Sequence, residues 1–137
     1  MSCVLRVVGE FLDVDQMVHV AAIQPYLVWR KGERKGGSGR PHERSGAFYL
    51  VSDADMNEVL RQVSEAEEYL ERNLAQISSI VSFPGVTAAV LDFAASLEEV
   101  QFNQSCRFSR NFLKLVVTAG VELELTQYAI CHEGAES

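Results

Sequence analysis

The sequence predicts an α+β domain, with a mostly antiparallel sheet and helices packed on one of its faces. Three observations support this class: the 137 residues match the length of one ordinary domain, 47% of them are hydrophobic, and strand-like and helix-like segments follow in the order βαββαβαβ. This order contains the split βαβ arrangement of ferredoxin-like folds. No linker interrupts it, so residues 1–137 are expected to form a single domain.

The first elements are a strand and a short helix. Residues 4–12 are rich in β-branched side chains, which favour a strand. Asp13 or Asp15 then offers an N-cap for a helix that ends near Ala22, because Pro25 cannot continue it.

Two further β-runs, residues 26–30 and 47–51, are expected to pair as a hairpin. The residues between them, about 31–46, hold five glycines and one proline among charged side chains. Such a composition cannot bury itself and predicts a mobile, basic surface loop.

The longest helix is predicted from Asp55 to about Val81. Its first four residues match a capping pattern, and apolar side chains recur along it at helical spacing. The apolar stripe thins at residues 64–67, where a break is expected. The opposite face carries charged side chains three or four residues apart that should point to solvent: Glu58, Arg61, Glu65, Glu68 and Arg72.

The remaining elements are two strands and a third helix. Residues 86–93 predict a buried strand whose one charged residue is Asp92. Ser109 is placed to cap a helix that ends at Gly120. Apolar and polar residues then alternate over 121–126, the period of a strand with one wet face.

The same periodicities predict the hydrophobic core. We expect mostly buried side chains at Leu5, Val7, Met56, Leu60, Val63, Leu70, Leu74, Val90, Phe112, Leu115, Leu123 and Leu125. The last residues, 132–137, are expected to form a frayed tail.

The cysteines and histidines form no recognisable metal or redox motif. The cysteines are odd in number and widely spaced, so buried free thiols are expected at Cys3, Cys106 and Cys131. The histidines lack the i, i+4 spacing that puts two ligands on one helical face: His19, His42 and His132. No metal or cofactor is therefore expected.

The charge of the chain is unevenly distributed. The net charge is −7, but residues 30–44 hold six of the twelve Lys and Arg with two Glu, a local charge of +4 that leaves −11 for the remainder. An acidic body favours basic partners and disfavours nucleic acid. No apolar stretch is long enough for a membrane and the first residues do not match a secretion signal, so we expect a cytoplasmic protein. We expect it to be a monomer or a homodimer.

Two groups of residues are candidates for binding. Trp29 is followed by cations that would clamp a phosphate or carboxylate in a cleft beside the loop: Arg30, Lys31, Arg34, Lys35 and Arg40. Trp29 would equally serve to anchor its strand in the core. On the long helix, Glu65, Glu68 and Glu71 form an acidic patch that suits a basic protein.

No set of catalytic residues is recognisable. The run Gly36-Gly37-Ser38-Gly39-Arg40 lacks the last glycine of a serine-nucleophile turn and the lysine of a phosphate loop. Asp92 is the most eligible isolated acid, because a carboxyl inside an apolar strand suits general-acid chemistry. A strand-end carboxylate bonded to backbone or facing water is the simpler interpretation. We therefore expect binding rather than catalysis.

Three segments resemble the bacterial domain-of-unknown-function family 4279. They are Pro25 to Glu33 (PYLVWRKGE), Ser45 to Tyr49 (SGAFY), and the stretch from Phe108 to Leu125. Where that family has Gly-Leu-Trp after the basic loop, this chain has Gly46-Ala47-Phe48. The resemblance implies a bacterial origin and the α+β fold.

Two hypotheses about function follow. The small size, the acidic body and the resemblance favour a protein-binding module, of the immunity type that neutralises a toxin by covering its active surface, with a basic toxin as partner. The rival is a small enzyme or ligand-binding domain that uses the cleft of Trp29 and the basic loop for an anionic small molecule.

Overall fold

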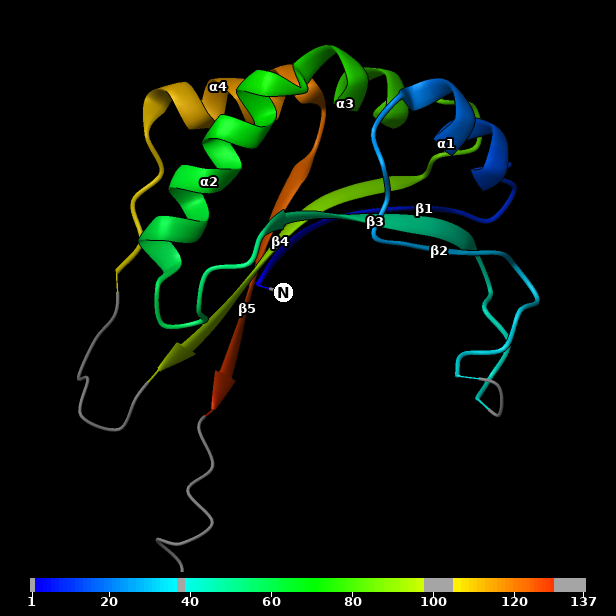
Figure 1. The fold of residues 1–137 in the computed structure, drawn as a ribbon, viewed down its shortest axis with the longest axis horizontal. Coiled ribbons are helices and arrows are strands. Elements are labelled where there is room, and N and C mark those ends of the chain that lie inside the picture. Colours follow the sequence, from blue (N-terminus) through cyan, green and yellow to red (C-terminus); the bar gives the residue numbers. More distant parts are fainter. Residues whose placement is uncertain (1, 37–38, 98–104, 130–137) are drawn as a thin grey trace, which may run out of the picture.

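The computed structural model describes residues 2–36, 39–97 and 105–129. Within them, five strands form one sheet, and four helices cover one of its faces (Figure 1). The strands are β1 (Cys3–Gly9), β2 (Leu27–Trp29), β3 (Ser45–Ser52), β4 (Ala88–Leu97) and β5 (Glu122–Ala129). The α+β class and the strand order along the chain are confirmed. Cys131 and the predicted tail, residues 132–137, lie outside the described residues.

The sheet has the order β2-β3-β1-β4-β5. β1 runs antiparallel to both β3 and β4, and β2 runs antiparallel to β3. β1 and β2 are therefore parallel with β3 between them, and β3 and β4 are parallel with β1 between them. These are two interlocked split βαβ units, as expected, and β5 extends them by pairing parallel to β4.

The strict alternation of β1 explains why the sheet has one dry and one open face. Cys3, Leu5 and Val7 are buried under the helices, whereas the intervening residues are only half-buried on the other face.

β1 ends at Gly9, earlier than the expected residue 12, and the backbone of Gly85 lies where a Cβ of residue 9 would stand. Burial raises the pKa of the Cys3 thiol above its usual range.

Two helices begin at the predicted caps. α1 (Val14–Ala21) has Asp13 as N-cap, whose side chain accepts a hydrogen bond from the Gln16 backbone N–H at 3.1 Å. α4 (Arg110–Ala119) has Ser109 as N-cap, whose Oγ accepts from the Phe112 N–H at 3.0 Å. Gly120 ends α4 with a φ of 82°, in the left-handed region that glycine adopts at low cost.

The predicted long helix is two helices, α2 (Val59–Arg72) and α3 (Leu74–Val81), joined at Asn73. The break expected at residues 64–67 was wrong, since these residues lie inside α2. The apolar stripe thins there because the one buried position of residues 64–67 is filled by the small Ala66, rather than because the helix ends. The capping pattern at Asp55 was also wrong, because α2 begins at Val59.

The core prediction was right for five of its twelve members. Leu5, Val7, Val63, Leu70 and Phe112 are buried. Leu60 and Leu125 are 63% and 53% exposed and do not belong to the core. The other expected members are half-buried: Met56, Leu74, Val90, Leu115 and Leu123.

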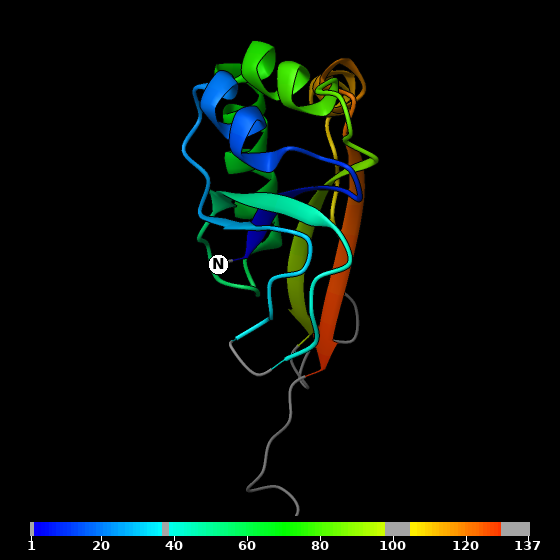
Figure 2. The same ribbon diagram turned by 90° about the vertical axis from the view of Figure 1, so that its right-hand side faces the viewer.

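The segment predicted as a loop extends the β2–β3 hairpin beyond the sheet. The backbone N–H of Gly32 donates to the His42 carbonyl at 2.9 Å, and the N–H of His42 donates to the Glu33 carbonyl at 2.7 Å. A β-bridge joins Arg34 to Pro41. We call residues 30–44 the basic hairpin; it projects from one end of the sheet (Figure 2). Its expected mobility stays a prediction.

Candidate functional site

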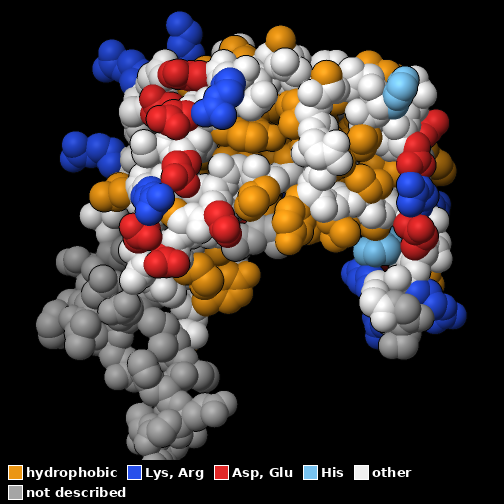
Figure 3. All heavy atoms as spheres, in the orientation of Figure 1, with side chains coloured by type: hydrophobic (Ala, Val, Ile, Leu, Met, Phe, Trp, Pro, Cys, Tyr) orange, Lys and Arg blue, Asp and Glu red, His pale blue; other side chains and the backbone are white. Residues whose placement is uncertain are grey.

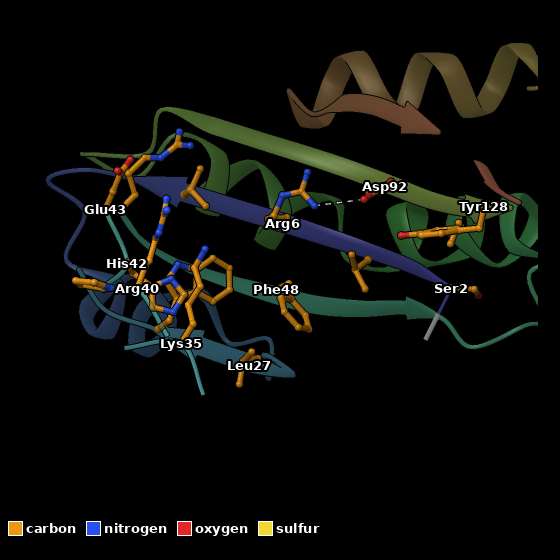
Figure 4. A pocket seen from close by; sticks show the side chains of 16 residues that line it. Ser2, Arg6, Leu27, Lys35, Arg40, His42, Glu43, Phe48, Asp92 and Tyr128 are labelled. Atoms are coloured by element: carbon orange, nitrogen blue, oxygen red, sulfur yellow. Dashed lines mark hydrogen bonds and ion pairs between the residues drawn. The ribbon is translucent and has the colours of Figure 1, made fainter. Parts of the chain in front are cut away.

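The open face of the sheet is hollowed into a groove of about 700 Å³. β1, β2, β3 and β4 form its floor, the basic hairpin forms one end, and Tyr128 of β5 lies at the other (Figure 4). Groove volumes of this order are typical of small-molecule sites.

None of the described helices is long and apolar enough to cross a membrane.

The floor of the groove is largely apolar. It is lined by the outward side chains of neighbouring strands: Val4, Val8, Leu27, Trp29, Phe48 and Ala94. Trp29 stacks on His42 with ring centroids 5.6 Å apart, and Phe48 stacks on Tyr26 at 5.7 Å. The six-membered ring of Trp29 lies over Gly46, where a Cβ would stand 2.5 Å from Cζ2. Glycine at position 46 thus leaves room for the indole against β3.

The hairpin end of the groove is basic. Lys35, Arg40 and Arg44 line it with His42, against one acid, Glu43. In the described part of the chain, the ion pairs do not involve these three cations. Figure 3 shows Lys and Arg side chains around the projecting hairpin, at the lower right. This end of the groove therefore has positive charge to offer an anion.

In the middle of the groove, the charged side chains are paired with one another. Arg6 donates through Nη1 to Asp92 at 3.3 Å and through Nη2 to Glu124 at 3.0 Å. The hydroxyl of Thr126 donates to the other oxygen of Asp92 at 3.1 Å. Asp92 thus lies within β4 and is bonded to side chains of β1 and β5, whereas the simpler interpretation placed it at a strand end, bonded to backbone or facing water.

Only part of the predicted cation clamp reaches the groove. Trp29, Lys35 and Arg40 line it. Arg30 instead forms a bidentate salt bridge with Asp15 of α1: its Nη2 donates to Oδ1 at 2.6 Å and its Nε donates to Oδ2 at 2.9 Å. These hydrogen bonds hold the pKa of the Asp15 carboxyl below its usual value.

The two other members of the predicted clamp also make contacts elsewhere. Lys31 pairs with Glu10 at 3.3 Å and lies 5.2 Å from the ring centre of Phe11. Nη1 of Arg34 donates to the Gly39 carbonyl of its own hairpin at 3.4 Å. These cations stabilise the hairpin and its contact with the β1–α1 turn rather than line the groove.

The acidic patch predicted on the long helix lies on α2, away from the groove (Figure 3, left). Glu65 accepts from the Ser52 hydroxyl at 2.5 Å and from Arg61 at 3.3 Å, and the Ser52 bond lowers the pKa of its carboxyl. Glu71 accepts from the Asn111 side chain at 2.8 Å, whereas Glu68 is exposed. Two of the three carboxylates therefore tie α2 to β3 and to α4.

Several groove residues were missed by the sequence analysis. Arg6, Phe48, Arg44 and Tyr128 were not singled out, although Arg6 interrupts an apolar strand at a position of the outward period. That alternation was the available signal. Among the described residues, no three His, Cys, Asp or Glu side chains gather as a metal site.

Comparison with family models, curated proteins and solved structures gives no match for this chain. The resemblance noted above therefore depends on its short motifs alone.

Proposed function

We propose that this protein is a binding module whose sheet groove holds an anionic small molecule. The observation that carries the proposal is the pairing, in one groove, of an apolar floor with cations that have no described ion-pair partner: Lys35, Arg40 and Arg44. An anion at that end gains charge-assisted hydrogen bonds, while the rest of the ligand covers Trp29 and Leu27. This supports the ligand-binding hypothesis over the toxin-binding one.

A double substitution tests this proposal. Organic anions at saturating concentration should raise the melting temperature of the protein, because a ligand at 100 times its Kd stabilises by about 2.7 kcal/mol. Arg40→Glu with Arg44→Glu should abolish the shift. Lys114→Glu makes the same kind of charge change on the exposed side of α4 and should leave it intact. A shift of equal size in all three proteins would overturn the proposal.

A protein partner is the second candidate, of the immunity type expected from the sequence. The exposed Glu68 on the rigid α2 supports it, because a basic surface would meet a carboxylate there without breaking an internal contact. Glu68→Lys should then abolish capture of a basic partner, and the Arg40 and Arg44 substitutions should not. The cytoplasmic location and the monomer or homodimer state remain predictions from the sequence.

A further inference from the structure

The distribution of charge along the groove defines the ligand more closely, on the premise that the groove binds an anion. We infer that the ligand is a monomeric amphiphile with one anionic head, a carboxylate or a phosphate monoester, and an aliphatic body. The head lies at the basic hairpin, and the body lies along the floor toward Tyr128.

The two ends of the groove differ in charge. Arg40 and Lys35 stand at the hairpin end, and Asp92 stands toward the Tyr128 end (Figure 4). The one cation of the middle, Arg6, is already shared between Asp92 and Glu124. A polyanion that followed the whole groove would therefore meet the Asp92 carboxylate after its first charges, and the one cation beside it is already paired. A ligand with a single charged end avoids that repulsion.

The aromatic rings of the floor are poorly placed to stack on a flat ligand. One face of Trp29 is taken by His42, and its six-membered ring lies over Gly46. Phe48 already stacks on Tyr26 and meets Trp29 at an interplanar angle of 54°. The exposed apolar surface that remains includes Leu27, Val4 and Val8, which suit an aliphatic chain better than a nucleobase.

The experiment uses Trp29 as reporter, because it is the single tryptophan of the chain and lies in the groove. Its fluorescence is titrated with decanoate below the micelle threshold, with 1-decanol as the neutral counterpart, with acetate as the head alone, and with AMP as a flat aromatic anion. We expect saturable binding of decanoate, and binding weaker by about tenfold or more for the other three.

Substitutions separate the head from the body. Arg40→Glu with Arg44→Glu should weaken decanoate by about tenfold or more and leave 1-decanol unchanged. Leu27→Asn, at a half-exposed position of the floor, should weaken both. Lys114→Glu is the control and should change neither.

The results that overturn the inference differ from those that overturn the proposed function. If AMP binds more tightly than decanoate, or if the protein sediments with anionic vesicles but ignores monomeric decanoate, the groove binds an anion of another class. If no anion changes Trp29 fluorescence, and the fluorescence titrations of the Arg40→Glu, Arg44→Glu protein are the same as those of the unsubstituted protein, the groove is not an anion site at all.

Discussion

At the scale of single residues, Tyr49 is the largest side chain that the core buries completely. It lies on the inward face of β3, and its hydroxyl has no hydrogen-bond partner among the described residues. Burial raises the pKa of this phenol from 10.0 to about 12. The neutral form is therefore favoured in the folded protein, and ionisation should oppose folding.

The first prediction concerns stability at high pH. Because the folded pKa of Tyr49 lies above the unfolded one, its contribution should be complete below pH 10.0 and fall as the pH rises toward about 12. Tyr49→Phe should make that fall shallower and should raise the free energy of unfolding at pH 7 by about 1 kcal/mol, since a buried hydroxyl without a partner is removed. Urea melts across this pH range measure both effects.

The exposed Tyr26 supplies the control for this prediction. It is 60% exposed, so Tyr26→Phe should change the free energy of unfolding at pH 7 by less than about 0.5 kcal/mol. A Tyr49→Phe protein that loses about 1 kcal/mol or more at neutral pH would show that the hydroxyl has a stabilising partner, and the prediction would be wrong.

At the scale of elements, α2 shows how far apolar periodicity determines a helix. The sequence correctly placed a helix here, but it included Leu60 in the buried stripe. The buried side of α2 contains Val59, Gln62, Val63, Ala66 and Leu70, and Gln62 is accepted because its side-chain amide donates to the carbonyls of Asp55 and Ala94, at 3.2 and 2.7 Å. The side-chain nitrogen of Gln62 is thus bonded to distant backbone, while its Oε1 has no hydrogen-bond partner among the described residues. Such a buried polar residue cannot be recognised from hydrophobicity alone.

The second prediction follows from the corrected face of α2. Leu60→Ala should change the free energy of unfolding by less than about 0.5 kcal/mol, because its side chain is 63% exposed. Leu70→Ala, at a fully buried position of the same helix, should cost about 2–5 kcal/mol. Denaturant melts of both proteins provide a matched pair. Equal losses would mean that α2 is rotated relative to this description.

Neighbouring elements explain why the fold was easier to predict than the groove. The order of helices and strands along the chain follows from local periodicity and from helix-capping residues such as Ser109 and Gly120, which act within one element. The groove instead combines side chains from distant parts of the chain, such as Trp29 of β2 and Tyr128 of β5. The basic segment was correctly identified as a cluster, but which cations face inward depended on Asp15 and Glu10, which lie more than a dozen residues earlier.

At the scale of the whole molecule, the charge of the body and the charge of the groove have opposite effects on an anion. The chain carries a net charge of −7, so its mean field repels an anionic ligand, whereas the cations at the hairpin end attract it at short range. Interactions between exposed charges are screened beyond about 8 Å at physiological ionic strength and beyond about 30 Å at 0.01 M. The two contributions should therefore separate with salt.

The third prediction uses this separation. Glu68→Lys makes the body less negative on the helix layer, away from the groove, so it should strengthen decanoate binding at about 0.01 M salt and change it less than about twofold at physiological salt. Arg44→Glu acts within the groove and should weaken binding at both salt concentrations, because a short contact is screened much less than a long-range field. Titration of Trp29 fluorescence in the unsubstituted protein and in both variants, at the two salt concentrations, measures the affinities that this comparison needs. If the two substitutions have effects of equal size and opposite sign at physiological salt, net charge alone governs binding, and the groove contributes no specific site for the anionic head.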